Sequence, residues 1–202
     1  MLILLLLAAF CAFPQEVEIH APWLTVYDPQ GRPRWEISLE RLYKTESGWE
    51  GEGVEVRLYW EGELEFSLRA ERLTADRLGR VWTITGDISG EAGGLALSCR
   101  EAVWSDGLTL TELLLAGADL RLSTASAHWA QGEEVLLTEV VAESRGWEVT
   151  LATATYLLDS GILDGKEAVI RGHGYEIRAA EARLFTREGG LQLREAQVVP
   201  HP

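Results

Sequence analysis

Basic residues are scarce in this chain of 202 residues, which has 18 Lys and Arg against 32 Asp and Glu and a formal net charge of −14. Nucleic-acid binding draws much of its affinity from Lys and Arg that neutralise phosphates, and docking on an anionic membrane surface uses the same charges. The composition therefore argues against both kinds of binding. Disorder is disfavoured as well, because 47% of the residues are hydrophobic.

Cysteine is also rare, with only Cys11 and Cys99 in the chain, so no disulfide framework is expected. No Gly-x-Ser-x-Gly turn exposes a nucleophile, and the glycines form no phosphate-binding loop ahead of a helix. Each histidine lacks a second His or Cys at metal-ligand spacing: His20, His128, His173 and His201. The sequence thus predicts no catalytic residue, no metal site and no cofactor, and we expect a protein that is not an enzyme.

The first 13 residues, MLILLLLAAFCAF, contain no charge and are followed by Pro14. A helix needs about 20 apolar residues to cross a bilayer, and this run is shorter. Its length is typical of the apolar core of a secretory signal peptide, although no Lys or Arg precedes it. We expect residues 1–14 to be a signal peptide or a short N-terminal membrane anchor, and residues 15–202 to form one exported domain.

A repeat with two sets of equivalent apolar positions runs along the rest of the chain. The first set follows steps of 31, 29, 25, 29 and 26 residues: Ile37, Leu68, Leu97, Leu122, Leu151 and Ile177. The second set follows steps of 27, 27, 27, 28 and 28 residues: Val54, Val81, Leu108, Val135, Leu163 and Leu191. Near-constant spacing of this size is typical of a repeat architecture, here of about six units.

Each unit has the pattern of two strands joined by a turn. Alternation places Leu95, Leu97 and Cys99 on one face of a strand, and the pattern shifts phase by one residue near the strand end. The strongest candidate for a helix, residues 66–78, does not keep its leucines on one helical stripe and is predicted to be a strand. The sequence therefore predicts an all-β domain built as an antiparallel meander.

The apolar face alternates bulky and small residues. In five of the six units, the residue two positions after the first-set residue is smaller: Ala70, Cys99, Thr124, Thr153 and Ala179. This pattern fits a narrow trough between two sheets and fits ordinary core packing equally well. Cys99 is expected to be a buried, unreactive thiol, because it lies on the apolar face.

The stretch from Val26, VYDPQGRPRWEISLERLY, resembles the opening of the LptC family and of related OstA-like (LptA-related) envelope proteins. The shared marks are an aromatic-Asp-x-x-Gly turn, an aromatic residue and an alternating strand: Tyr27, Asp28, Gly31, Trp35, Ile37 and Leu39. The stretch from Glu65, EFSLRAERLTADRLGRVWTITGDIS, resembles the next unit of that family, and later units continue in the same style. The resemblance covers nearly the whole chain after residue 23.

This resemblance implies a twisted, open β-jellyroll with two facing sheets, a slit between them and little helix. It also implies a periplasmic protein, tethered to the inner membrane or free, that binds lipopolysaccharide or a similar long-chain glycolipid. Such a protein would receive the lipid from an inner-membrane ABC exporter complex and pass it towards the outer membrane. The implied lipid groove is lined by Ile37, Leu39, Phe66, Leu68, Leu97, Cys99, Leu122, Leu151 and Ile177.

Partner binding in this family implies pairing of exposed edge strands with similar jellyroll proteins, here at Val26 in the first strand and Leu193 in the last. Because the chain is so acidic, we expect an anionic lipid to be held by its acyl chains with little help from surface charge. Two other interpretations remain open. One is a β-solenoid scaffold or surface protein, and the other is a small outer-membrane β-barrel.

Overall fold

The computed structural model describes residues 18–200, so the predicted signal peptide or anchor over residues 1–14 lies outside the described residues. Within that range every regular element is a strand, and no helix is long and apolar enough to cross a membrane. The strands are β1 (Glu18–His20), β2 (Trp23–Tyr27), β3 (Pro33–Ser38), β4 (Arg41–Lys44), β5 (Gly48–Trp60), β6 (Glu63–Asp76), β7 (Trp82–Ala92), β8 (Leu95–Trp104), β9 (Leu108–Ala116), β10 (Leu120–Trp129), β11 (Glu134–Ser144), β12 (Trp147–Leu157), β13 (Ile162–Gly172), β14 (Tyr175–Phe185), β15 (Gly190–Arg194) and β16 (Gln197–Pro200).

All sixteen strands belong to one antiparallel sheet, in which β4 to β15 pair in chain order. Three of the long strands are each interrupted and form two shorter strands in succession: β1 and β2, β3 and β4, and β15 and β16. β3 and β4 both pair with β5, β15 and β16 both pair with β14, and β1 and β2 pair with β4 and β3. Among the described strands, those at the two ends of the sheet do not pair with each other. The sheet is therefore open, and the predicted antiparallel meander is confirmed; of the strand predicted over residues 66–78, residues 66–76 lie in β6 and the last two lie in the following turn.

Most long strands bend near their middle, where one residue leaves the regular ladder. In β9 the buried residues are Leu108 and Leu110 before the bend, and Leu113 and Leu115 after it. Between them Glu112 has a φ of 51°, in the left-handed region, while the pairing of β9 with β8 and β10 keeps one register on both sides of the bend. Equivalent residues on β11 and β13 are Glu139 (51°) and Glu167 (54°). The predicted phase shift is thus a turn of the backbone at one left-handed residue, and it lies near the middle of the strand rather than near its end.

A substitution at one bend should show how much the bend depends on backbone conformation. Glu139 is exposed, so its side chain contributes little packing. Because positive φ is unfavourable for β-branched residues, Glu139→Val is expected to lower the free energy of unfolding by about 1–2 kcal/mol. Glu139→Gly, which relieves this conformational cost, is the matched control and should stay within about 1 kcal/mol of wild type. Urea denaturation measures both, and equal stability of the two variants would contradict the left-handed conformation at Glu139.

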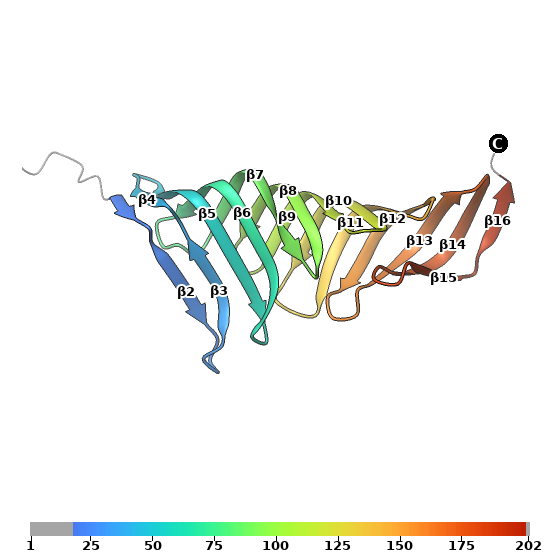
Figure 1. The fold of residues 1–202 in the computed structure, drawn as a ribbon, viewed down its shortest axis with the longest axis horizontal. Helices are drawn as coiled ribbons and strands as arrows, with labels where there is room; N and C mark the ends of the chain where they lie inside the picture. Colours follow the sequence, from blue (N-terminus) through green and yellow to red (C-terminus); the bar gives the residue numbers. More distant parts are fainter. Residues whose placement is uncertain (1–17, 201–202) are drawn as a thin grey trace, which may run out of the picture.

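The bends fold the single sheet into two facing walls. Wall A comprises β2, β3, β16 and the halves of the long strands paired in line with them, and wall B comprises β1, β4, β15 and the other halves. The walls meet where the rings of Phe66 on β6 and Trp129 on β10, two strands that are not neighbours in the sheet, lie 4.9 Å apart. Figure 1 shows the strands lying side by side along an elongated molecule, with β2 near one end and β16 at the other.

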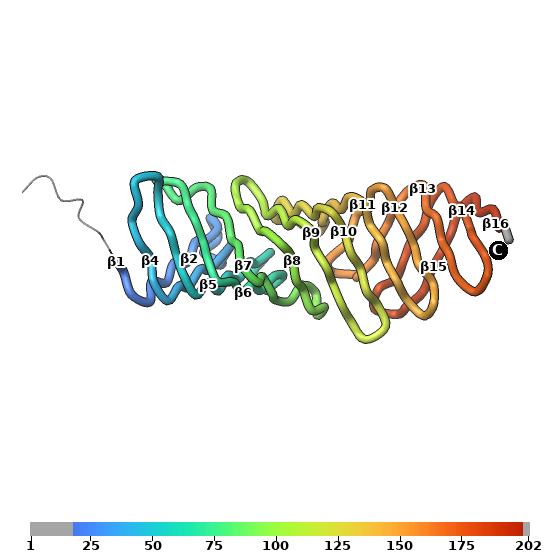
Figure 2. Tube along the Cα trace, turned by 90° about the horizontal axis from the view of Figure 1, so that it is seen from above, coloured from blue at the N-terminus to red at the C-terminus, as the bar shows by residue number. Residues whose placement is uncertain are grey.

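The turns line two rims that flank the slit between the walls. Turns at the free edge of wall A include four two-residue hairpins in which both residues have positive φ: Glu61–Gly62, Gly93–Gly94, Arg145–Gly146 and His173–Gly174. This is the type I′ geometry that matches strand twist. We call these turns, together with residues 117–119, rim A. Rim B comprises the longer turns at residues 105–107, 130–133, 158–161 and 186–189. Figure 2 shows the successive turns as loops along the two sides of the molecule.

Candidate functional site

All nine predicted groove residues face the interior between the walls. Seven of them are less than one-tenth exposed, and Cys99 and Ile177 are half-buried against the same core. Eight lie on wall A, and Leu39 lies at the bend between β3 and β4. The predicted groove residues therefore lie on one wall of the interior, and none of them lies on the other.

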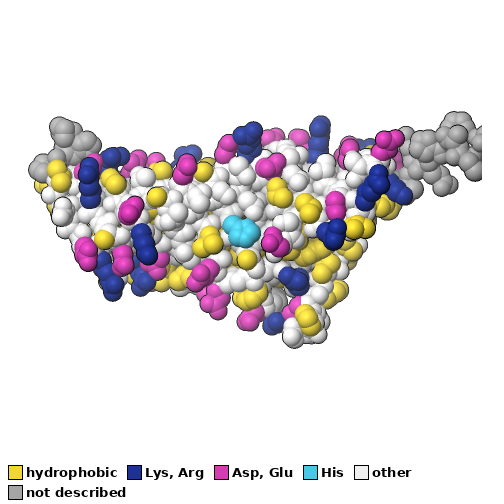
Figure 3. Space-filling model, turned by 180° about the vertical axis from the view of Figure 1, so that it is seen from behind, with side chains coloured by type: hydrophobic (Ala, Val, Ile, Leu, Met, Phe, Trp, Pro, Cys, Tyr) yellow, Lys and Arg dark blue, Asp and Glu magenta, His cyan; other side chains and the backbone are white. Residues whose placement is uncertain are grey.

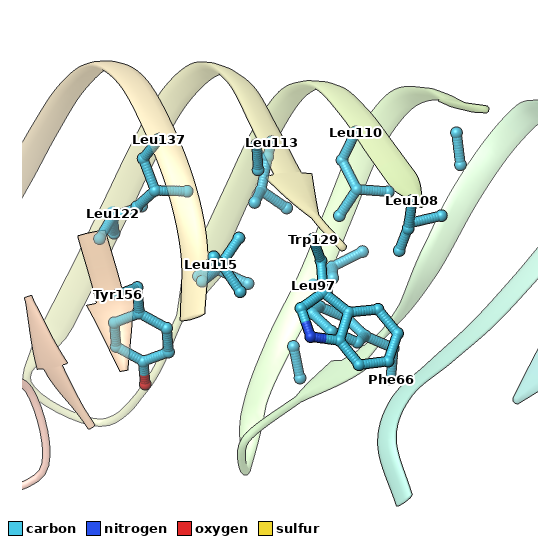
Figure 4. Packing of buried hydrophobic residues seen from close by; sticks show 14 of the residues in the cluster. Phe66, Leu97, Leu108, Leu110, Leu113, Leu115, Leu122, Trp129, Leu137 and Tyr156 are labelled. Atoms are coloured by element: carbon cyan, nitrogen blue, oxygen red, sulfur yellow. The ribbon is translucent and has the colours of Figure 1, made fainter. Parts of the chain in front are cut away.

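The opposite wall contributes residues that the groove prediction missed. Its buried members include Ile84, Leu110, Trp129, Leu137, Tyr156, Leu163 and Leu184. The second set of repeat positions was the available signal, because Leu108, Val135 and Leu163 from that set are buried on wall B. Figure 4 shows side chains of both walls in this interior, among them Leu108, Leu110 and Leu137 of wall B and Leu113 and Leu115 of wall A.

Most of the interior is packed by the protein's own side chains. Leu68, Leu122 and Leu151 are at most 1% exposed and belong to one continuous apolar core. Fully burying such a side chain contributes about 1.5–3 kcal/mol to folding. In the described state the interior is thus a core over most of its length, and space remains where the walls diverge.

One space lies at the N-terminal end, where a cavity of about 220 Å³ opens between the walls. Its lining is almost entirely apolar: Pro22, Leu24, Trp35, Ile37, Leu39, Leu42, Trp49, Leu73, Ala75, Gly79 and Trp82. Trp82 stacks on Trp104 with ring centroids 5.7 Å apart. Within residues 18–200 the Trp82 Nε1 is buried without a hydrogen-bond acceptor, which costs about 1–3 kcal/mol. Because its lining is almost entirely apolar, the cavity can take an apolar chain.

A second space lies between the walls in the C-terminal half. This cleft of about 280 Å³ is bounded by Ala142 and Val149 from wall A, Leu184 and Leu191 from wall B, and residues of the rims. A larger hollow of about 720 Å³ lies on the outer face of wall B, but polar groups line it. There Arg183 donates two hydrogen bonds to Asp164, at 2.7 and 2.8 Å. The two apolar spaces between the walls are therefore the better candidates for an acyl chain.

Exposed hydrophobic side chains gather at the two ends of the sheet. At the N-terminal end they are Ile19, Trp23, Leu24 and Tyr27, and at the C-terminal end Tyr175, Leu191, Val198 and Val199. Figure 3 shows hydrophobic side chains near the N-terminal end and charged ones spread over the rest of that face. Val26 lies half-buried in β2 and Leu193 half-buried in β15, so both predicted contact residues are on terminal strands. Unpaired strand edges with apolar side chains favour association.

The outer face of wall A near the C-terminal end is covered by ion pairs. Glu176 accepts hydrogen bonds from Arg178 at 2.9 Å and Arg171 at 3.1 Å. These bonds hold the pKa of the Glu176 carboxyl below its usual range. Exposed pairs of this kind contribute little to stability, and they keep the outer surface polar.

Within residues 18–200, no group of three or more His, Cys, Asp or Glu side chains is placed to hold a metal ion. His128 lies on β10, where its Nδ1 is 3.1 Å from the Thr109 hydroxyl. His173 lies in a rim A turn, edge-on to the Trp147 ring at 5.0 Å. His128 thus has a structural contact on a strand, and His173 has one in a turn.

Cys99 is expected to react slowly with thiol reagents in the folded protein. Burial raises the pKa of its thiol to about 12, against an ordinary value of 9.0. At pH 8 the reactive thiolate is therefore on the order of 1,000-fold scarcer than in an unfolded chain. The measurement is the rate of reaction with a disulfide reagent in a Cys11→Ser variant, with and without denaturing urea. Similar rates in both conditions would contradict the burial of Cys99.

The same shift makes stability depend on pH in the alkaline range. The unfolded chain loses the Cys99 proton near its ordinary pKa of 9.0, whereas the folded chain holds it up to about 12. The folded state therefore binds more protons between these values, and its stability should fall as the pH rises through that window.

The likeness of this chain to known proteins is weak. No family profile matches this chain, and no curated protein matches its sequence. Among solved structures, a match is the crystal structure of LptH from Pseudomonas aeruginosa, the LptA-homologous periplasmic component of the lipopolysaccharide transport device. The two are 12% identical with a TM-score of 0.27, over 68% of this chain and 95% of that chain. The fold assignment therefore rests on the strand pairing of this chain itself.

Proposed function

We propose that this protein holds the acyl chains of lipopolysaccharide or a similar glycolipid between its two walls and passes the lipid across the periplasm. The observation that carries the proposal is the apolar interior, which runs the length of an open sheet and leaves apolar spaces between the walls. The sequence resemblance to LptC and OstA-like proteins supports the same function, with an inner-membrane ABC exporter as the source of the lipid. Export and tethering by residues 1–14 belong to this proposal.

The transfer we propose is passive. Burial stabilises each acyl methylene by about 0.8 kcal/mol, and exchange between two similar interiors changes little in free energy. The N-terminal cavity of about 220 Å³ is smaller than typical ligand pockets, which are roughly 300–1,000 Å³, so it accommodates only part of a lipid. A complete lipid therefore requires the walls to move apart.

The slit is the place where the walls can part. No strand ladder within residues 18–200 joins rim A to rim B, so the walls can open by flexing at the bends without breaking backbone pairing. What holds the walls together across the slit is side-chain contact. The contacts include the rings of Phe66 and Trp129 and the hydrogen bond that Arg34 on β3 donates to Gln131 in rim B.

Photo-crosslinking tests the proposal directly. A photoreactive residue at Leu97 or Leu122, both inward, should label lipopolysaccharide, whereas the same group at outward Arg100 should not. Labelling from Arg100 alone would contradict a lipid site between the walls. A scaffold protein, the alternative function, would give no label from any of the three positions.

We propose further that the two ends of the sheet pair with similar jellyroll proteins. β1 leads into β2 from wall B to wall A, and β15 leads into β16 in the same direction. When the C-terminal end of one protein meets the N-terminal end of the next with their walls in line, the joining strands run parallel. Such a joint extends both the sheet and its apolar interior.

Proline at the edge is expected to weaken partner capture. Val26→Pro and Leu193→Pro each remove a backbone N–H from a terminal strand, so both should lower the yield of captured partner at least several-fold. Val26→Ala and Leu193→Ala keep the N–H and serve as matched controls. Thermal unfolding of each variant verifies the fold, and undiminished capture by the folded proline variants would contradict edge pairing.

A further inference from the structure

A hollow of about 350 Å³ lies in the slit, where rim A and rim B approach each other in the C-terminal half. Glycines and two arginines dominate its lining: Gly93, Gly94, Leu95, Gly117, Ala118, Asp119, Leu120, Ser144, Arg145, Tyr156, Thr186, Arg187 and Gly189. Arg145 comes from rim A and Arg187 from rim B. The two arginines therefore line one space from opposite rims.

Glycines leave room for both arginine side chains. A Cβ at Gly189 would lie 2.8 Å from the Arg145 guanidinium carbon, and a Cβ at Gly161 would lie 2.9 Å from the Arg187 Cγ. Arg187 also donates a hydrogen bond of 3.0 Å to the Leu158 carbonyl. Arg145 itself has a φ of 49°, an uncommon conformation for a long side chain in a position that Asn or Gly usually takes.

The hollow is positive in a protein that is strongly negative. Its lining holds two arginines and one acid, Asp119, which is a net +1 against −14 for the chain, and Glu65, outside the lining, interacts electrostatically with Arg187. The Arg145–Asp119 ion pair is loose, at 3.6 Å, and both side chains are more than half exposed. A guanidinium has five N–H donors, so most donors of the pair remain free. Two arginines with free donors at one hollow suit a phosphate, which a guanidinium binds bidentately.

The apolar cleft described above adjoins this hollow. The two spaces share Ser144, Arg145 and Gly189 in their linings, and the cleft continues inward between Val149 and Leu184. A molecule with a charged head and an apolar tail would therefore meet positive charge at the slit and apolar surface directly beneath it. This is the arrangement of an amphiphile with a phosphate head group.

We propose that Arg145 and Arg187 bind the phosphate head group of an acyl lipid whose chain lies in the adjoining cleft. The proposal rests on the proposed function, because it uses the same interior, and adds the class of head group. It also changes the expectation that surface charge contributes little to lipid binding. The overall charge is unfavourable to an anion, but the slit offers a local exception.

The test compares two amphiphiles that share one tail. Dodecyl phosphate and dodecyl maltoside, each below its critical micelle concentration, compete with a fluorescent acyl probe bound to the full-length protein. The displacement of the probe gives the affinity of each amphiphile. The Arg145→Gln/Arg187→Gln variant is expected to lose about 10- to 100-fold in affinity for dodecyl phosphate and to keep its affinity for dodecyl maltoside. Arg100→Gln, on the outer face beside Glu112, is the control and should change neither affinity.

The outcomes separate the two proposals. Equal affinity of the wild type and the double variant for dodecyl phosphate would overturn the head-group site and leave lipid binding intact. Failure of both amphiphiles to bind would overturn the proposed function as well. Competition by inorganic phosphate as strong as that by dodecyl phosphate would assign the arginines to a free anion and overturn the lipid assignment. Weaker binding of dodecyl phosphate in added salt, without an effect on the maltoside, would support the site.

Discussion

Replacement of Trp129 by alanine is expected to lower the free energy of unfolding by about 3–5 kcal/mol. Trp129 ends β10 at 1% exposure, and its Nε1 donates a hydrogen bond of 2.7 Å to the Gly132 carbonyl. Its ring packs on Phe66 of the opposite wall. Truncation therefore leaves a large cavity and also removes a contact that holds the two walls together.

Urea denaturation followed by circular dichroism measures this effect. Trp23→Ala is the control, because Trp23 is 71% exposed at the end of the sheet and its loss should cost less than about 0.5 kcal/mol. A double-mutant cycle with Phe66→Leu should give a coupling of about 0.5–1.5 kcal/mol for the aromatic pair. Equal stability of the Trp129 and Trp23 variants would show that the walls are not joined at this contact.

Replacement of Gly90 by alanine is expected to destabilise the protein by about 3 kcal/mol or more. Gly90 lies in β7, paired with Leu68 of β6 and Leu97 of β8 in the middle of wall A. A Cβ at this position would overlap the Ser67 carbonyl oxygen. Because the obstacle is backbone rather than a flexible side chain, the strands themselves must shift, and the inward Leu68 and Leu97 shift with them.

Gly132→Ala provides the matched control for Gly90. No heavy atom lies within 4 Å of a Cβ at Gly132, and its backbone conformation is accessible to alanine. This variant should remain within about 0.5 kcal/mol of wild type in the same denaturation experiment. If both alanine variants unfold at the same urea concentration, the close approach of β6 and β7 at Gly90 is wrong.

Strand formation was the part of this structure that local sequence predicted best. Period-two alternation depends only on neighbouring residues, so it located β8 and the strand over residues 66–78 without knowledge of their partners. The phase shift in the pattern also had a local cause, since residues such as Glu112 and Glu139 take positive φ and turn the chain. The one misplacement was of the shift itself, which lies at mid-strand.

Contacts between the walls were beyond the reach of local pattern. Phe66 and Trp129 pack together from strands that are distant along the chain, and no periodicity within either strand specifies that contact. For the same reason the alternation of bulky and small residues could not separate a trough from a core. Whether space remains beside Leu39 or Val149 depends on which side chains face it from the opposite wall.

Charge shows most clearly the difference between what the sequence determines and what only the tertiary structure decides. The scarcity of Lys and Arg is a property of the sequence, and from it alone we predict that neither nucleic acid nor an anionic membrane surface is a favourable partner. The meeting of Arg145 and Arg187 at one hollow was decided only by the tertiary structure, because two different rims supply them. Net charge sums over the whole chain, whereas a bound group responds to the few charges within a Debye length of about 8–10 Å, and folding selects which charges those are.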